Sequence, residues 1–258
     1  MAFNKFQCYL INIQSVGNKT NTIRNIIKDQ ELDICMLTET WLSNNVSDSS
    51  KIKEMTPLTH RFYHIPRENK NGGGVGLFVK KTYTVSVLNQ QIYNSFEHIN
   101  SKIKCKNKTI QTIIIYKPSN TSKRLFIDEF SNLLDTVAKN RNILICGDFN
   151  LHLDNISDYY VNEFIELLES HDLENIVDKP TSLQNHIIDL VIQNKENKMV
   201  HGVEIEPECV TSPMHKSVLF NINIQKINVQ KKIITYRDKT NFDAELFIEK
   251  SVDDIKKN

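Results

Sequence analysis

Short apolar runs recur along the chain, and most of them are bounded by glycine, asparagine, serine or lysine. Runs of this length that are rich in isoleucine and valine are typical of buried strands. The pattern predicts strands over residues 6–13, 33–37, 75–79, 82–88, 96–105, 109–116, 143–146, 186–192 and 215–224. Because helical segments separate groups of strands, we expect two sheets packed face to face with helices outside them.

Three other segments repeat their apolar residues at helical spacing, which predicts amphipathic helices over 22–30, 123–139 and 160–171. The segment 44–55 is polar and serine-rich, and it predicts a mobile surface loop. The glycine cluster at 72–76 is only superficially like a phosphate-binding loop, since a strand follows it and no Lys-Ser/Thr pair does. We interpret it as a turn that enters a closely packed strand.

Chain length and composition limit the fold to a few classes. At 258 residues the chain suffices for one large α/β or β-sandwich domain, or for a domain with a tail. With 40% hydrophobic residues and a mean hydropathy of -0.38 it can bury a sizeable core and remain soluble. From about residue 225 onward lysine and glutamine dominate, so we expect a compact domain over 1–225 and a tail over 226–258.

Charge and cysteine content bear on partners and location. The net charge of +1 gives no global basic field, although a local patch that binds phosphates is still allowed. Cys8, Cys35 and Cys146 lie in apolar runs without CxxC or zinc spacing, which favours buried thiols in a reducing compartment. Neither a signal peptide nor a run long enough to cross a bilayer is apparent. We therefore expect an intracellular, soluble protein with no membrane partner.

The segment 143–152 carries the most informative chemistry. Its apolar strand breaks at Gly147 and delivers Asp148 and Asn150, whose side chains point the same way in an extended segment. A carboxylate suits proton transfer or a metal, and a neutral amide can hold a phosphate oxygen. The alternative is an ordinary turn, in which Asp and Asn are common for local hydrogen-bonding reasons.

Further polar residues lie at strand ends or inside strands. Asp189 interrupts the apolar run 187–192, where a charge is costly unless it is paired. His215 opens a strand, and an Asp–His pair is what a general base requires. Glu39 and Asn12 follow buried strands, and Glu39 could hold a hard cation such as Mg²⁺. The alternatives are a strand with one wet face for Asp189, a structural histidine, and a surface or capping glutamate.

Together these residues resemble the endonuclease/exonuclease/phosphatase superfamily, and more narrowly the apurinic-type endonuclease domain of non-LTR (LINE-like) retrotransposons. Gly-Asp-Phe-Asn at 147–150 is common to the superfamily, whereas Thr-Glu-Thr-Trp-Leu at 38–42 points to the retroelement branch. The tail around 234–242 is similar to the connector that precedes reverse transcriptase in such elements, and no polymerase sequence follows it here. The segments that carry the resemblance, in the order of the family, are 11–15, 33–42, 73–78, 95–97, 115–118, 146–150, 186–192 and 212–215.

The resemblance implies a fold, a reaction and a partner. The fold would be a DNase I-like four-layered α/β sandwich, with two packed mixed sheets flanked by helices. The reaction would be hydrolysis of a DNA phosphodiester that depends on Mg²⁺, with Mn²⁺ as a substitute. DNA would be the partner, and an enzyme acting on chromosomal DNA would be nuclear. The sequence implies no stable protein partner and leaves the oligomeric state and the target site open.

The resemblance also assigns roles to individual residues. Glu39 would be the main Mg²⁺ ligand, with Asn12 beside it. Asp148 would orient the attacking water or assist the leaving oxygen. Asn150 and Tyr116 would bind the substrate through the non-bridging phosphate oxygens.

The histidine and its surroundings show both the implied role and the departures from the family. His215, oriented by Asp189, would be the base or the transition-state stabiliser. Met214 stands where the family has aspartate, and methionine is a poor ligand for Mg²⁺. Gln14 stands where arginine is frequent, and Asn185 replaces a common glycine. These departures suggest an alternative, a relic or domesticated domain that binds nucleic acid with weakened or no catalysis. A further alternative is a branch of the superfamily that acts on phosphoinositides or sphingolipids.

Overall fold

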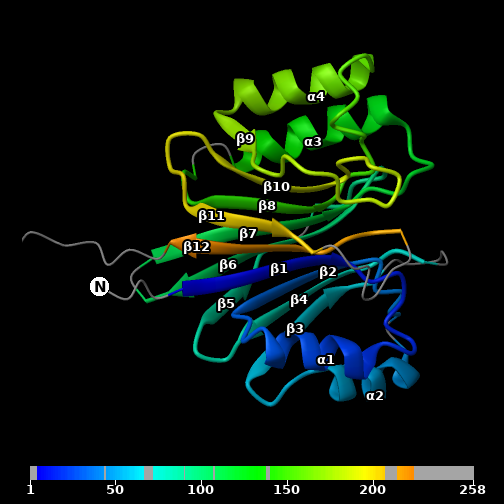
Figure 1. Cartoon of the computed structure of the whole chain (residues 1–258), viewed down its shortest axis with the longest axis vertical. Helices are drawn as coiled ribbons and strands as arrows, with labels where there is room; N and C mark the ends of the chain where they lie inside the picture. The colour runs from blue at the N-terminus through cyan, green and yellow to red at the C-terminus, as the bar shows by residue number, and fades with distance from the viewer. Residues whose placement is uncertain are drawn as a thin grey trace, which may run out of the picture. The chain divides into compact units, whose positions relative to one another are not determined.

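Two six-stranded sheets pack face to face in the described part of the chain (Figure 1). The computed structural model describes residues 5–43, 45–66, 72–89, 91–106, 108–137, 140–206 and 214–223, all within the unit Met1–Gln225. The expected tail, 226–258, lies outside the described residues.

The strand order of each sheet mixes parallel and antiparallel neighbours. The first sheet runs β11 (Val200–Ile205), β12 (Val218–Asn223), β1 (Lys5–Asn12), β2 (Ile34–Thr38), β4 (Val75–Lys80) and β3 (His60–Ile65). The second runs β5 (Thr84–Val87), β6 (Glu97–Cys105), β7 (Lys108–Tyr116), β8 (Ile143–Asp148), β10 (Asp189–Asn194) and β9 (Leu173–Asn175). The pairs β1–β2 and β7–β8 are parallel, and the other neighbours are antiparallel.

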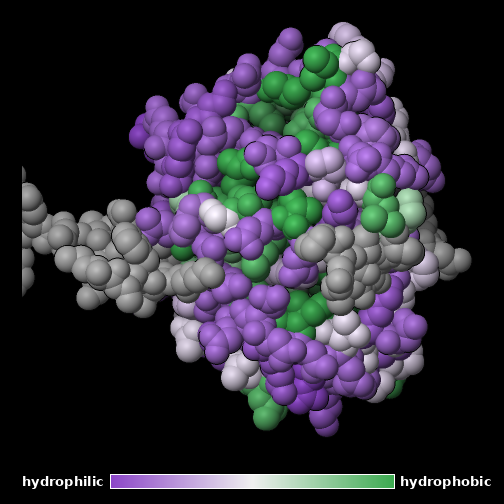
Figure 2. Space-filling model, viewed as in Figure 1, coloured by the Kyte–Doolittle hydropathy of each residue, from purple (hydrophilic) through white to green (hydrophobic). Residues whose placement is uncertain are grey.

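Four helices complete the layers among the described residues. Helices α1 (Thr20–Asp29) and α2 (Val46–Met55) lie over the outer face of the first sheet, and α3 (Lys123–Val137) and α4 (Tyr159–Ser170) lie over the outer face of the second (Figure 1). The expected four-layered α/β sandwich with two mixed sheets is therefore confirmed. The surface seen in Figure 2 is largely hydrophilic, with hydrophobic residues gathered mainly in the middle band over the sheets.

Successive side chains along a strand point to opposite faces of its sheet. The buried residues therefore form one core between the sheets and one under each pair of helices. In β1, Phe6, Cys8 and Leu10 belong to the core shared by the two sheets, whereas Tyr9 and Ile11 pack with α1 and α2. The strands β8 and β10 alternate in the same way between the shared core and the core under α3 and α4. Both faces of these central strands are covered, which is why they appear in the sequence as continuous apolar runs.

The structure corrects the interpretation of residues 44–55 as a loop, because most of them form a helix. Residues 46–55 form α2, because Asn45 caps it by accepting a hydrogen bond from the Asp48 amide and Met55 is buried at its other end. Asp48 is also buried, and it accepts hydrogen bonds from Ser43 and from Lys51 at 2.8 Å. The serine-rich composition masked a helix whose N-terminus is stabilised by side-chain capping.

Several strand boundaries also differ from the sequence prediction. Strands β3, β9 and β11 were not predicted, and each has a partly exposed side that weakens its apolar pattern. The last strand begins at Val218, so His215 lies ahead of it and forms only an isolated bridge with Ser182. Similarly, β10 begins at Asp189. Asp189 thus stands at the start of its strand instead of inside it, and His215 precedes its strand instead of opening it.

The four described cysteines, Cys8, Cys35, Cys105 and Cys146, are buried and unpaired, as expected for three of them. Among the described residues, none of the helices has the length and apolar character needed to span a bilayer.

Candidate active site

In the central strands, every second side chain faces the core that the two sheets share. At one end of these strands the last such side chain is polar, and these polar residues lie together. Asn12 ends β1, Tyr116 ends β7 and Asp148 ends β8, each in phase with residues of the shared core. All three side chains are buried. They therefore lie at one end of the space between the sheets, where the apolar core gives way to polar groups.

Asp148 and Asp189 are direct partners across the antiparallel pair β8–β10. His215 contacts both carboxylates: its Nδ1 is 3.0 Å from Asp189 Oδ2, and its Nε2 is 4.0 Å from Asp148 Oδ2. The Asp189 carboxylate thus fixes the orientation of the imidazole and leaves Nε2 directed toward Asp148. This is the Asp–His pair that the sequence predicted.

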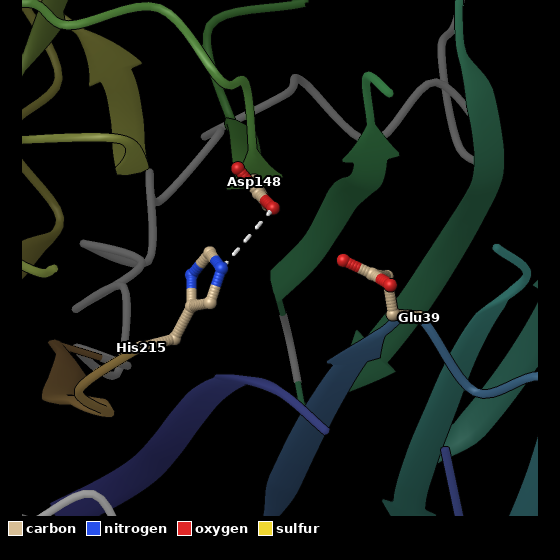
Figure 3. Close-up of side chains that lie close together, drawn as sticks. All are labelled: Glu39, Asp148 and His215. Atoms are coloured by element: carbon tan, nitrogen blue, oxygen red, sulfur yellow. Dashed lines mark ion pairs between the residues drawn. The ribbon is translucent and has the colours of Figure 1, made fainter. Parts of the chain in front are cut away.

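The amide of Asn12 stands at the centre of the cluster. Its Nδ2 lies 2.9 Å from Glu39 Oε1, 2.9 Å from Asp148 Oδ2 and 3.4 Å from His215 Nε2. Glu39, Asp148 and His215 each offer a ligand atom within 4.8 Å of the others, and their side chains converge from three different segments (Figure 3). Six of the residues chosen from the sequence therefore meet, namely Asn12, Glu39, Asp148, Asn150, Asp189 and His215.

The turn after β8 depends on a glycine and on a left-handed residue. A Cβ atom on Gly147, whose φ is 152°, would lie 1.8 Å from the carbonyl oxygen of Ile115 on β7. Asn150 has a φ of 45°, and its Nδ2 donates to Asp148 Oδ2 at 3.1 Å and to the Lys117 carbonyl at 2.8 Å. Asn150 thus meets Asp148 through a tight turn, and not through the extended alternation that the sequence suggested.

Burial and neighbouring charges shift the pKa values of the two central groups. Burial is the main cause that raises the pKa of Asp148, and the charge of Asp189 raises it further, while the charge of His215 and the hydrogen bond from Asn12 lower it. Burial by itself lowers the pKa of His215, but the charge and hydrogen bond of Asp189, together with Asp148 and Glu39, raise it to about 9. Both pKa values are therefore moved away from their ordinary range by burial and by a specific charged partner, a combination that is typical of functional sites.

The donor set fits a hard divalent cation. Two carboxylates, from Glu39 and Asp148, supply the oxygen ligands that Mg²⁺ and Mn²⁺ prefer. Asn12 directs its nitrogen toward these carboxylates, while its Oδ1 accepts a hydrogen bond from the Gln14 amide at 3.1 Å. In this orientation Asn12 positions the carboxylates, and it would have to turn its amide over to serve as the metal ligand that was expected.

The structure also defines the neighbours of two other residues that the sequence analysis considered, Tyr116 and Met214. Tyr116 is buried and is the cross-strand partner of both Asp148 and Glu97, so its backbone is fixed next to the cluster. Met214 is 38% exposed, and its carbonyl accepts a hydrogen bond from the Leu183 amide at 3.1 Å. A thioether therefore adjoins His215 where the resemblance implied a carboxylate.

Two supporting residues were not found from the sequence. Thr181 Oγ1 accepts hydrogen bonds from the amides of Ile188 and Asp189, both at 3.0 Å, and so fixes the start of β10. Lys19 Nζ donates to the Ile13 carbonyl at 2.7 Å and to that of Gln14 at 3.0 Å. Burial lowers the pKa of Lys19, and the charge of Glu39 opposes that shift. Neither residue belongs to a local pattern, so only the tertiary structure could identify it.

A comparison with known proteins identifies the family. Residues 10–184, more than half of the chain, match the endonuclease/exonuclease/phosphatase family. The chain belongs to this family. Asn12, Glu39, Tyr116, Asp148 and Asn150 fall within the matched segment, and the family's enzymes are hydrolases that depend on divalent metal ions. Among curated proteins, no significant sequence match was found.

Several solved structures share the fold of this chain. The endonuclease domain of TRAS1, a telomere-specific non-LTR retrotransposon, superposes with a TM-score of 0.69 and 14% identity, covering 86% of this chain and 100% of that domain. The AP endonuclease LMAP from Leishmania major gives 0.64 and 12%, covering 85% and 88%. The 3′ phosphatase NExo from Neisseria, bound to a product DNA hairpin, gives 0.62 and 12%, covering 84% and 99%.

Proposed function

We propose that this family member is a Mg²⁺-dependent endonuclease, derived from a retrotransposon, that nicks DNA by hydrolysing a phosphodiester bond. The observation that carries the proposal is the convergence of Glu39, Asp148 and the Asp189–His215 pair at one end of the space between the sheets. The Thr-Glu-Thr-Trp-Leu segment at 38–42 and the fold shared with the TRAS1 endonuclease domain support the retroelement origin.

The residues around the cluster have distinct tasks in this proposal. Glu39 and Asp148 would hold Mg²⁺, or Mn²⁺ in its place, with Asn12 next to them. When bound, such a cation polarises the phosphoryl oxygens and offsets the charge that develops on them. Asn150 and Tyr116 would contact the non-bridging oxygens, and Asn150 would exchange its hydrogen bond to Asp148 for one to the phosphate.

The water and the leaving group would be handled by the two groups at the centre of the cluster. His215 Nδ1 bonds to Asp189, which leaves Nε2 to accept a proton from the attacking water or to stabilise the phosphorane-like transition state. Asp148, as a carboxylate, would orient that water or assist the leaving 3′ oxygen, which takes its proton from solvent as the P–O bond breaks. An enzyme that acts on chromosomal DNA in this way would work in the nucleus.

Conversion of supercoiled plasmid to open circles tests the proposal. We expect nicking with Mg²⁺, loss of nicking with a chelator, and loss in His215→Ala. His186→Ala is the matched control, because His186 also pairs with an aspartate, Asp154 at 2.9 Å, but is partly exposed and outside the cluster. Equal nicking by the wild-type protein and His215→Ala would rule out the proposed site. Release of inorganic phosphate from a soluble phosphomonoester, without nicking, would favour a phosphatase branch instead.

One observation favours a second candidate function. Met214 adjoins His215 and supplies no hard oxygen, which weakens the metal site of a chain otherwise built to bind DNA. The second candidate is thus a relic or domesticated domain that binds nucleic acid without efficient catalysis. Retention of DNA in a mobility-shift assay, with no nicking at any Mg²⁺ concentration, would support it over the endonuclease.

A further inference from the structure

Trp41 is an exposed aromatic residue in direct contact with a residue of the candidate active site. It is the only tryptophan in the sequence, and 51% of its surface is exposed. Its indole Nε1 donates a hydrogen bond to Glu39 Oε2 at 3.2 Å. An indole gains considerable free energy from burial, so a half-exposed one beside a cluster of charged groups requires a reason.

The backbone around Trp41 is held in an unfavourable conformation. Glu39 and Trp41 both have a φ of 54°, in the left-handed region that costs residues other than glycine on the order of 1 kcal/mol or more. The amides of Thr40 and Trp41 donate to the carbonyls of Gly74 and Gly73 at 3.1 and 2.8 Å. The Ser15 amide donates to the Glu39 carbonyl at 2.8 Å from the other side. Two loops thus fix the backbone from which the indole projects.

The indole ring also lies against the glycine turn. A Cβ atom on Gly72 would lie 3.5 Å from the indole Nε1 and 3.7 Å from Cε2, so the ring rests against this turn. The indole therefore bonds to Glu39 through its N–H group and packs against the glycine turn. About half of its surface remains open to solvent.

The same contact orients the carboxylate of Glu39. Its Oε2 accepts from Trp41, and its Oε1 accepts from Asn12 Nδ2 at 2.9 Å. With one donor on each oxygen, the carboxylate cannot rotate freely, which fixes the lone pairs that a cation would use. The N–H group of Trp41 therefore has a positioning role, whereas its exposed surface is available for a ligand.

From these contacts we propose that Trp41 is a stacking platform for a nucleobase next to the scissile phosphate, and that its N–H group positions Glu39. The inference rests on the proposed endonuclease function, because a phosphate held by a cation at Glu39 would bring the adjoining nucleoside to the indole. Stacking on an aromatic side chain contributes about 1–3 kcal/mol per base and tolerates any base, since every base has a π-face. Trp41 would thus add affinity for DNA without selecting a sequence.

Because Trp41 is the sole tryptophan, its fluorescence reports the contact directly. His215→Ala protein with Ca²⁺ is titrated with a single-stranded oligodeoxynucleotide and with an oligonucleotide of the same length that consists of abasic sugar phosphates. We expect the base-containing strand to quench the emission and the abasic strand to leave it nearly unchanged. Equal quenching by both strands, or quenching by neither, would overturn base stacking.

Two substitutions in the otherwise wild-type protein distinguish the stacking role of the ring from the positioning role of its N–H group. Both are measured in the nicking assay. Trp41→Ala should raise the KM for DNA about tenfold, which corresponds to about 1.4 kcal/mol. Trp41→Phe keeps a ring but loses the N–H group, so it should retain a KM within about threefold of wild type while requiring more Mg²⁺. Tyr159→Ala is the matched control, an exposed aromatic residue at the start of α4. An unchanged KM in Trp41→Ala would overturn the platform, and an unchanged Mg²⁺ requirement in Trp41→Phe would overturn the positioning role.

The outcomes distinguish this inference from the endonuclease proposal. Normal nicking together with absent quenching and an unchanged KM in Trp41→Ala would remove the inference alone. Base-dependent quenching in a protein that never nicks DNA would remove the endonuclease proposal and leave Trp41 as a nucleobase contact. If Trp41→Ala does not fold, the quenching comparison and Trp41→Phe still decide the question.

Discussion

Asp148 and Asp189 face each other directly across the antiparallel strands β8 and β10, and both carboxylates are buried. Like charges at opposed positions of a sheet destabilise it, and burial increases the cost. His215 lies between them and contacts both carboxylates, and Asp189 Oδ1 has no hydrogen-bond partner among the described residues. The fold therefore brings acidic groups together at the position where a cation would be bound.

The pairing predicts that Asp189→Asn disables the site without unfolding the protein. Asparagine has nearly the same volume, but it cannot stabilise the imidazolium of His215 or hold the same tautomer. We expect nicking to fall by roughly 10²-fold or more, with an unchanged circular dichroism spectrum. Asp154→Asn, which alters the partly exposed Asp154–His186 pair, should nick normally. Wild-type nicking by Asp189→Asn would show that the His215 orientation is unimportant.

The convergence of Glu39 and Asp148 also predicts that Mg²⁺ stabilises the folded state. A ligand that binds only the folded state adds about 2.7 kcal/mol at 100 times its Kd. We expect the Tm to rise with Mg²⁺ concentration in the wild-type protein and to rise much less in Glu39→Gln. Glu54→Gln, in an exposed position of α2, is the control and should respond like the wild type. Identical Mg²⁺ responses of Glu39→Gln and wild type would exclude Glu39 as a ligand.

Gly147 is predicted to be irreplaceable. A Cβ atom there would lie 1.8 Å from a backbone oxygen of the neighbouring strand, which cannot move without breaking the β7–β8 pairing. Gly147→Ala should therefore reduce the free energy of unfolding by more than about 3 kcal/mol, or prevent folding. Gly17→Ala is the comparison, because its nearest atom, Ser15 Oγ at 3.3 Å, belongs to a side chain. Denaturant titration measures both, and a loss in Gly147→Ala no larger than that in Gly17→Ala would contradict the clash.

His98 is predicted to make the stability of the protein depend on pH. Burial beside Tyr93 and Phe96 lowers the pKa of His98 from 6.5 to about 4. The unfolded chain therefore binds a proton below about pH 6.5 that the folded chain does not, and the folded state loses stability as the pH falls from there toward 4. The contribution is up to about 3 kcal/mol, at roughly 1.4 kcal/mol per pKa unit. Denaturant titrations between pH 7.5 and 4.5 should give a shallower decline for His98→Leu than for wild type, and equal declines would disprove this.

Much of the fold was predictable because the central strands are buried on both faces. Their apolar runs are continuous, and the polar residues that end them, Asn12, Tyr116 and Asp148, are visible in the sequence for that reason. Helix α2 was missed because its stability comes from the Asn45 cap and the buried Asp48 instead of from an apolar stripe. The strands β3, β9 and β11 were missed since partial exposure interrupts their pattern.

The candidate site was predictable as a set of residues but not as a geometry. Nothing in the sequence shows that Asn12 directs its nitrogen at the carboxylates of Glu39 and Asp148, or that Asn150 reaches Asp148 from a left-handed conformation. These features depend on the meeting of segments that are far apart in the chain. Thr181 and Lys19 escaped detection for the same reason, because their partners are defined by loop packing alone.

Met214→Asp is predicted to strengthen the metal site. The substitution places a carboxylate next to His215, on a half-exposed residue whose replacement disturbs little of the core. An added hard oxygen increases affinity for Mg²⁺, so the concentration needed for half-maximal nicking should fall by about tenfold. Met214→Asn, which has similar size and no charge, should change it by less than about threefold. If Met214→Asp restores nicking to an inactive protein, the second candidate describes the natural chain, and the methionine is the cause of its inactivity. If the Mg²⁺ requirement of an active protein does not change, residue 214 lies too far from the cation to act on it, and the departure from the family at this position has no bearing on catalysis.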